Sequence, residues 1–182
     1  MEARAADDML MLVDDADVVV GYESKERCHD GAGLLHRAFS VFLFNAHGEL
    51  LVQQRSAEKR LWPLYWSNSC CSHPRRGEET ASAAVRRVRE ELGVGATLRY
   101  VYKFRYQARF EQAGSEHELC SVFLGRADVD PKVDPAEIAA WRFVAPEALS
   151  GEIEAAPARF TPWFKMEWQR LATDFEGTLS DE

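Results

Sequence analysis

The stretch SNSCCSHPRRGEETASAAVRRVREELGV, residues 67–94, holds the densest group of reactive side chains in the sequence. Its second half predicts a helix over 79–92, because apolar residues recur three or four positions apart and Gly93 follows where a left-handed cap ends a helix. That helix would carry Arg87 and Glu91 on one face, and a surface ion pair explains them most simply. A strand, a loop rich in Gly and Arg, and a helix ending in EELG can also form a unit in which a carboxylate holds a divalent cation while Arg binds phosphate.

Strands are predicted on both sides of this stretch. The β-rich run LLHRAFSVFLF, residues 34–44, leads through a turn at 45–48 into ELLVQQR, and the pair predicts a β-hairpin. The other predicted elements follow from hydrophobic pattern and turn residues. In chain order they are one or two strands within 9–20, a long ordered loop over 56–72, strands over 98–108, 119–125 and 141–144, and a C-terminal helix over 161–175.

Length and charge narrow the classes of protein. A chain of 182 residues with 46% hydrophobic content can bury one sizeable core, so we expect a single domain over 1–182, with its core at about 34–150 and residues 1–8 disordered. The net charge of −8 argues against nonspecific nucleic-acid binding. The lack of a long apolar run, the acidic N-terminus and four irregularly spaced cysteines predict a cytoplasmic protein with reduced thiols and no membrane partner.

Residues 72–94 resemble the Nudix box, G-x5-E-x7-R-E-U-x-E-E-x-G-U, in which U is apolar. The matching positions are Glu78, Arg86, Val88, Glu90, Glu91, Gly93 and Val94. Ser72 replaces the first Gly, and Arg87 replaces the Glu of the R-E pair. Nudix hydrolases group these carboxylates to bind the magnesium ions that activate water at a diphosphate. Arginine at position 87 should weaken that function and strengthen plain diphosphate binding.

These departures resemble those of one Nudix branch, the type I isopentenyl diphosphate isomerases. Five segments are similar to landmarks of that family, in the family's order: ERCHDGAGLLHRAFSVFLFN, WPLYWSNSCCSHPRRGE, KFRYQA, SEHELCSVF and FTPWF. The resemblance implies an α/β fold, the Nudix α/β/α sandwich with a mixed sheet and extra N- and C-terminal elements. It also implies an isomerase of isoprenoid precursor biosynthesis, which interconverts isopentenyl diphosphate and dimethylallyl diphosphate through a tertiary carbocation.

A metal site is the first chemical feature that the resemblance implies. Glu116 and Glu118 alternate on one face of a predicted strand, where a shared cation would relieve their repulsion. Taken alone, they are explained by a solvated hairpin face, and each histidine by a structural role. The resemblance assigns five residues to a single divalent metal: His29, His36, His73, Glu116 and Glu118. Nitrogen and carboxylate ligands without a thiolate suit Mn²⁺, Mg²⁺ or Zn²⁺.

Proton transfer at carbon needs an acid and a base on either side of the substrate, in an apolar pocket that excludes water. By resemblance, Cys71 and Glu118 are this pair, with the Tyr106 hydroxyl polarising Glu118. Trp163 is similar to the aromatic residue that the family places over the cation. Taken alone, Cys71 is explained more simply as a buried inert thiol. Trp163 is explained equally well as a core tryptophan. On a strand Cys70 would face the other way and only pack.

The diphosphate needs a basic holder of its own. The resemblance matches four residues to that role: Lys25, Arg55, Lys59 and Arg87. It also implies a Mg²⁺ that bridges the phosphates to Glu91 and to the Cys71 carbonyl. Such a local patch reconciles an anionic substrate with an acidic protein.

Two rival functions follow from the same residues. The first is a Nudix hydrolase of a diphosphate, which Arg87 and the Cys71 constellation disfavour. The second is a noncatalytic metal-binding module, which the presence of Tyr106 and Glu118 together with Cys71 disfavours. In either enzyme reading the partner is a small diphosphate, and we expect a monomer or small homo-oligomer.

Overall fold

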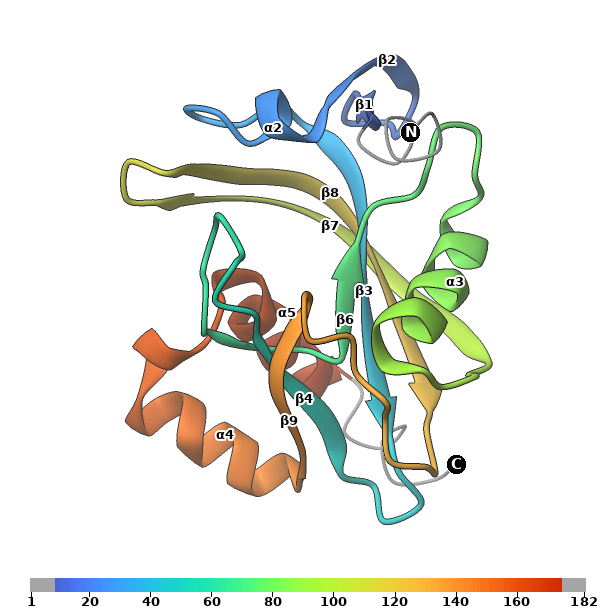
Figure 1. The fold of residues 1–182 in the computed structure, drawn as a ribbon, viewed down its shortest axis with the longest axis vertical. Helices are drawn as coiled ribbons and strands as arrows, with labels where there is room; N and C mark the ends of the chain where they lie inside the picture. The colour runs from blue at the N-terminus through green and yellow to red at the C-terminus, as the bar shows by residue number, and fades with distance from the viewer. Residues whose placement is uncertain (1–8, 175–182) are drawn as a thin grey trace.

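The computed structural model describes residues 9–174, which form one nine-stranded sheet with helices packed on both faces (Figure 1). The expected disorder of residues 1–8 and the helical position of Phe175 lie outside the described residues. The elements are β1 (Met9–Val13), β2 (Val19–Ser24), α2 (Lys25–Cys28), β3 (His36–Phe44), β4 (Leu50–Arg55), β5 (Trp66–Ser67), β6 (Cys70–Ser72), α3 (Thr80–Leu92), β7 (Leu98–Phe110), β8 (Gly114–Arg126), β9 (Ile138–Val144), α4 (Pro146–Ala155), the 3₁₀ turn η1 (Pro157–Arg159) and α5 (Pro162–Asp174). The predicted α/β class with a mixed sheet is confirmed.

Strand β3 lies at the centre of the sheet, between two hydrophobic cores. It pairs in parallel with β8 over its whole length and antiparallel with β6. Successive strand residues point to opposite faces, so Ala38 and Phe42 join the core that contains α5, while Phe39 and Val41 join the core that contains α3. Alternate residues of one strand therefore serve the two sides of the sheet.

The predicted hairpin over 34–55 is only partly correct. Its turn is present, but within the described residues the pairing of β3 with β4 is limited to Phe44 and Leu50. Beyond that pair, β4 pairs with β5 and β9, whereas Cys70–Ser72 of β6 pair with Phe39–Val41 of β3. Backbone groups of the segment 66–72 thus pair with β3 and β4 at positions where a simple hairpin would pair these two strands with each other. The end of the predicted loop over 56–72 is consequently two short strands, which bring Cys71 into the sheet.

The predicted helix over 79–92 is confirmed as α3, with Glu79 at its N-cap position. Ala84, Val88 and Leu92 are buried against the sheet. Gly93 ends the helix at φ 66°, and a Cβ there would also meet the backbone oxygen of Lys132 at 2.9 Å.

Other predicted strands are longer in the structure than in the prediction. Strands β7 and β8 extend to a short turn at 111–113, so most of the polar segment 109–115 belongs to the hairpin. Strand β9 begins at Ile138 rather than Trp141, and helix α4 was not predicted. The longer β8 includes both predicted glutamate ligands.

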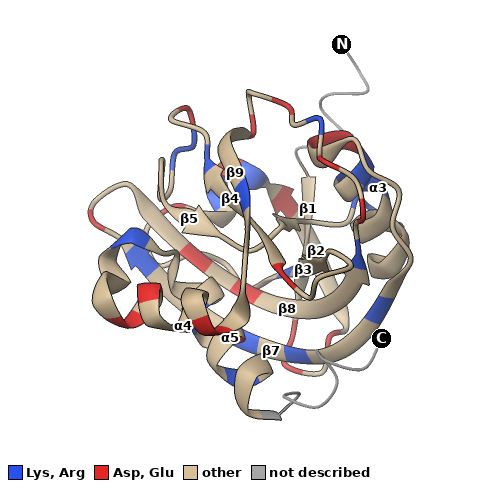
Figure 2. Ribbon diagram, turned by 90° about the horizontal axis from the view of Figure 1, so that it is seen from below, with Lys and Arg blue, Asp and Glu red and all other residues tan. Residues whose placement is uncertain are grey.

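Charge is mixed along the described ribbon, with Lys and Arg interspersed among Asp and Glu (Figure 2). This distribution differs from the broad single-sign surface that binds nucleic-acid backbones nonspecifically. Among residues 9–174, every helix is too short or too polar to cross a membrane.

Candidate active site and metal centre

A cavity of about 490 Å³ opens beside the sheet, where β6, β7 and β8 face α2 and α5. The four predicted proton-transfer and cation-facing residues line it: Cys71, Glu118, Tyr106 and Trp163. The four predicted diphosphate ligands also line it: Lys25, Arg55, Lys59 and Arg87. The structure therefore brings both predicted sets into one space, although they come from segments far apart in the sequence.

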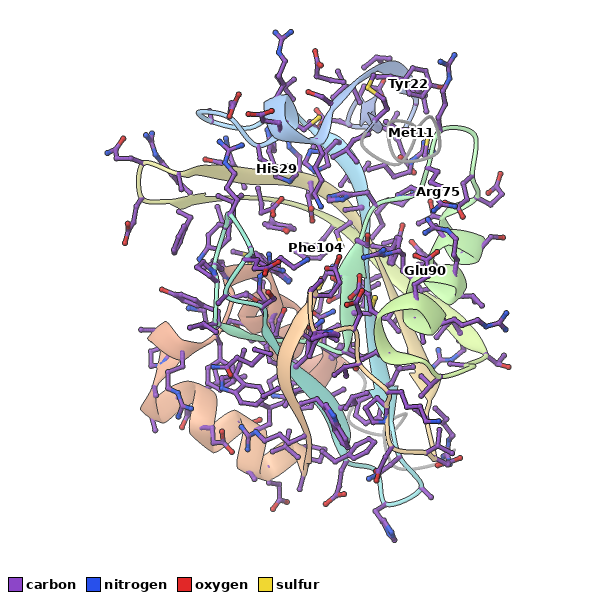
Figure 3. All side chains as sticks on the ribbon, viewed as in Figure 1. Met11, Tyr22, His29, Arg75, Glu90 and Phe104 are labelled. Carbon is purple, nitrogen blue, oxygen red and sulfur yellow. The ribbon has the colours of Figure 1, made fainter. Side chains whose placement is uncertain are left out.

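The five predicted metal ligands meet at one end of this cavity. His29 follows α2 and lies beside β8 (Figure 3), His36 begins β3, and His73 follows β6. Glu116 and Glu118 are on β8, whose register sets Glu118 directly opposite His36. One candidate ligand atom from each residue lies within 4.8 Å of all the others.

Backbone contacts hold His29 in this position. Its carbonyl oxygen accepts a hydrogen bond from the Ser115 amide at 2.9 Å, which ties the end of α2 to the start of β8. Gly114, at φ 142°, makes this possible, because a Cβ at that position would collide with the His29 oxygen.

The histidine rings are oriented by their outer nitrogens. His29 Nδ1 lies 2.6 Å from the Lys25 carbonyl oxygen, and His36 Nδ1 lies 2.7 Å from the Leu34 carbonyl oxygen. Each Nδ1–H donates to its carbonyl, which leaves the Nε2 lone pair directed at the cluster, as in histidines that bind metals. Burial lowers the pKa of His73 to about 3, so that ring is neutral at pH 7 and also able to act as a ligand.

Two buried atoms in the cluster are better placed to bind a cation than to form a hydrogen bond with each other. His29 Nε2 and Glu116 Oε2 are 2.8 Å apart, yet neither makes a hydrogen bond of satisfactory geometry. His73 Nε2 lies 3.0 Å from Glu118 Oε1. Burial opposes ionisation of Glu118, but the neighbouring His36 and His73 hold its pKa well below the usual range. Three imidazoles and two carboxylates of this kind form a group that could hold a divalent metal.

Replacing one member of the cluster should reduce metal binding without unfolding the protein. We expect Glu116→Gln and His73→Ala each to weaken metal affinity by at least about 10- to 100-fold, since even partners of metal ligands have effects of that size. Metal content after dialysis, measured by elemental analysis, tests this expectation. His117→Ala is the matched control, because His117 lies between the two glutamates on β8 and points to the opposite face. Native stoichiometry in both cluster variants would show that these residues do not bind the ion.

Cys71 is held from two sides within the cavity. Trp163 donates its indole N–H to Cys71 Sγ at 3.2 Å, and the Cys71 thiol donates to Asn68 Oδ1 at 2.7 Å. Burial raises the pKa of Cys71 to about 12, although Arg55 and Trp163 act in the opposite direction, so the group is a thiol at neutral pH. Its neighbour Cys70 is fully buried in the core beneath α3, as expected from strand alternation.

Glu118 is the second predicted proton-transfer residue. Tyr106 is its cross-strand partner on β7 and donates its hydroxyl to Glu118 Oε2 at 2.6 Å. The Tyr106 ring centroid is 6.1 Å from that of Trp163, which is 5.2 Å from Trp62. Between the thiol and the carboxylate the wall of the cavity is therefore aromatic.

Three of the four basic residues, Lys25, Lys59 and Arg87, lie near an acidic residue that the sequence analysis missed. Glu137, just before β9, lines the cavity and pairs with Lys59, and its Oε1 is 3.4 Å from Arg87 Nη2. Although burial favours its neutral form, Lys59 and Arg87 hold the pKa of Glu137 below its usual range. Burial and the nearby Lys59 lower the pKa of Lys25. Glu137 belongs to none of the sequence motifs described above. Its place beside the cavity is therefore apparent only from the fold.

Glu91 and His36 are the predicted site residues that do not line the cavity. His36 is fully buried, within the group of five candidate metal ligands. Glu91 is 3% exposed and pairs with Arg87, and burial raises its pKa. In the described structure Arg87, not Glu91, reaches the cavity surface. The bridging role predicted for Glu91 stays a prediction.

Comparison with known proteins gives a consistent result. The model of the NUDIX domain matches residues 34–164, which leaves β1, β2, α2 and most of α5 outside it. Isopentenyl-diphosphate Delta-isomerase 1 of Photorhabdus laumondii is 43% identical over 161 residues, covering 87% of this chain and 92% of the relative. Isopentenyl-diphosphate Delta-isomerase of Nocardia farcinica is 46% identical over 153 residues, covering 84% and 87%.

Solved structures agree on the fold. A crystal structure of a Deinococcus radiodurans protein aligns with a TM-score of 0.67 at 27% identity, covering 81% of this chain and 89% of that one. A MutT protein from Methanosarcina mazei aligns with a TM-score of 0.63 at 19% identity, covering 79% and 95%. The expected Nudix fold is confirmed, and the chain belongs to the Nudix superfamily and, within it, to the isopentenyl-diphosphate Delta-isomerases.

Proposed function

We propose that this protein interconverts isopentenyl diphosphate and dimethylallyl diphosphate, using Cys71 and Glu118 as its proton-transfer pair. One observation carries the proposal: a thiol and a carboxylate line a single cavity whose wall between them is aromatic. The names of the relatives support the same substrate and product.

The substrate would be held by its phosphates and left free at its hydrocarbon end. Lys25, Arg55, Lys59 and Arg87 supply positive charge for the diphosphate, and Arg87 can contact phosphate oxygens with two N–H groups. The isoprenoid carbons would then lie against Tyr106 and Trp163. Aromatic walls exclude the water that would otherwise capture a cation.

The reaction is a proton added at one carbon and a proton lost at another. One member of the pair donates to the terminal methylene carbon, the double-bond electrons form the new C–H bond, and positive charge appears at the tertiary carbon. The other member takes a proton from the carbon next to the CH₂O group, and that C–H electron pair becomes the new double bond. In the reverse direction the two residues exchange roles, and the ring face of Trp163 stabilises the charge by about 0.5–2 kcal/mol.

The residues of the metal cluster would set the state of Glu118. A divalent ion bound there, which we propose to be Mn²⁺, Mg²⁺ or Zn²⁺, would supply positive charge that favours the Glu118 carboxylate. His29, His36, His73 and Glu116 would hold Glu118 in place, while its second oxygen keeps the Tyr106 hydrogen bond. We propose a separate Mg²⁺ on the diphosphate, with Glu91 and the Cys71 carbonyl as its protein ligands.

The hydrolase alternative is weaker. A hydrolase needs grouped carboxylates and an activated water at phosphorus. Here Arg87 stands where the pattern has Glu, and it already pairs with Glu90, Glu91 and Glu137. An arginine in that place binds the diphosphate rather than activating water against it.

Solvent deuterium distinguishes the two reactions. Purified protein incubated with isopentenyl diphosphate and magnesium in deuterated water should give dimethylallyl diphosphate with deuterium in a methyl group. The label enters because the donated proton comes from Cys71 or Glu118, both of which exchange with solvent. Mass spectrometry of the product and a phosphate assay measure the two outcomes together.

The other results would each remove the proposal. Release of phosphate from an unchanged carbon skeleton would identify a hydrolase. Absence of either reaction in a sample shown to contain bound metal would instead support a binding module. A methyl group without deuterium would exclude an exchangeable donor and hence the pair named here.

A further inference from the structure

Glu167 is a buried carboxyl that the reaction described above does not use. It lies on α5, one helical turn after Trp163, and its side chain is 0% exposed. Because residues four apart share a helix face, the turn that brings Trp163 to Cys71 also directs Glu167 into the sheet beneath the cavity. One of its oxygens, Oε2, has no hydrogen-bond partner among the described residues.

Within the described residues, the contacts of the Glu167 carboxyl are to neutral groups. Its Oε1 is 3.7 Å from Cys120 Sγ, and the Ser40 hydroxyl is close enough to hydrogen-bond to the carboxyl. Burial raises the pKa of Glu167 to about 8, with the nearby Glu118 acting in the same direction. The side chain is therefore a neutral carboxylic acid at pH 7.

A short chain of contacts joins Glu167 to the thiol of Cys71. Ser40, on β3, stands between them: its Oγ is 3.9 Å from Cys71 Sγ and 3.4 Å from Cys120 Sγ. The Ser40 hydroxyl carries one hydrogen, so it can donate either to the Cys71 sulfur or to Glu167, but not fully to both. The direction of that hydrogen therefore depends on whether the Glu167 carboxyl can donate a hydrogen bond or can only accept one.

We propose that Glu167 is a positioning residue for Cys71 and that it acts through the Ser40 hydroxyl. A neutral carboxylic acid can donate to Ser40 Oγ, which leaves the hydroxyl hydrogen directed at Cys71 Sγ. A carboxylate can only accept, so it draws the same hydrogen away and leaves the sulfur without that bond. The consequence for catalysis rests on the proposed role of Cys71 in proton transfer.

This arrangement makes the activity depend on the protonation of Glu167. The titratable or charged groups that face it are Cys71 of β6, Glu118 and Cys120 of β8 and Tyr102 of β7. On its own helix, Arg170 stacks on Tyr102. Below pH 8 Glu167 is neutral and the bond to Cys71 is present. Above pH 8 it ionises, and one pH unit above its pKa about tenfold fewer molecules retain the neutral form. The value of kcat should fall in proportion.

The test compares pH profiles of kcat and infrared spectra for the wild type, Glu167→Gln, Ser40→Ala and the double variant. Glu167→Gln keeps a neutral donor at every pH, so it should retain kcat within about threefold at pH 7 and lose the decline above pH 8. In the Ser40→Ala background the same change should alter kcat by less than about twofold, since the connecting hydroxyl is gone. Met166→Gln, at the exposed neighbouring position, is the control and should leave the profile unchanged.

Infrared spectra test the inference even in a protein without isomerase activity. At pH 7 the wild-type minus Glu167→Gln spectrum should contain the C=O stretch of a protonated carboxyl, which disappears above pH 8. The S–H stretch assigned to Cys71 through Cys71→Ala should shift over the same range, and only when Ser40 is present. An ionised Glu167 at pH 7, an unshifted S–H band, or a decline in kcat that persists in Glu167→Gln would overturn the proposal. Failure of the deuterium experiment would instead remove the proposed reaction and leave the spectra to decide on Glu167.

Discussion

Replacing Cys71 by alanine should lower kcat by about 10²- to 10⁴-fold, the usual contribution of a positioned acid or base. The same replacement at Cys70 should leave kcat within a few-fold of the wild type. Both thiols are on β6, but Cys71 lines the cavity and accepts the Trp163 N–H, whereas Cys70 packs under α3. Steady-state conversion of isopentenyl diphosphate, followed by mass spectrometry, measures the difference.

Thermal unfolding serves as the control for this pair. Cys70→Ala should cost about 1 kcal/mol of stability, because it removes a fully buried sulfur. Cys71→Ala should cost less, since its side chain is only partly enclosed. Equal losses of kcat in the two folded variants would refute the assignment of Cys71 to proton transfer.

Glu118→Gln should cause a loss of comparable size, at about 10²- to 10⁴-fold in kcat. An amide keeps the shape of the side chain but cannot transfer a proton to or from a carbon atom of the substrate. Tyr106→Phe should cost less, because it removes only the hydroxyl that donates to Glu118 Oε2 and leaves the carboxylate in place. The change in kcat at saturating substrate is the quantity to compare.

Metal content separates the two possible causes of the Glu118→Gln effect. Glu116→Gln alters the neighbouring carboxylate in the same cluster and is the matched control. If excess metal restores Glu116→Gln but not Glu118→Gln, then Glu118 acts in proton transfer as well as in the cluster. Restoration of both variants by metal alone would assign Glu118 a purely structural role.

The sequence contained enough information for the elements with strong local signals. Helix α3 follows from its apolar spacing and from Gly93, which ends it in the left-handed conformation. The alternation of Glu116 and Glu118 was enough to place both on one strand face. The cluster itself was inferred from family resemblance, because no spacing rule connects His29 to residues nearly ninety positions later.

Pairing between distant segments was less predictable. The turn after Phe44 suggested a simple hairpin, but the backbone groups of β3 are taken by β6 and β8, which lie far along the chain. Periodicity within a segment cannot reveal which other segment will compete for its hydrogen bonds. Glu137 and Glu167 were missed for a related reason, since each gains its significance from residues on other elements.

The central position of β3 has a consequence for local stability. Three of the five candidate metal ligands lie on β3 and β8 in the interior of the sheet, and His73 follows β6. Lys25 and Lys59 belong to a short helix and a loop at the rim, and the fifth candidate ligand, His29, follows that same helix. Backbone amides in an interior sheet exchange with solvent only through large cooperative openings, while rim segments open locally at much lower free energy. Opening of the rim alone would therefore let a diphosphate enter and leave, and of the five candidate metal ligands it would displace only His29, while the other four would stay in place until the sheet opens.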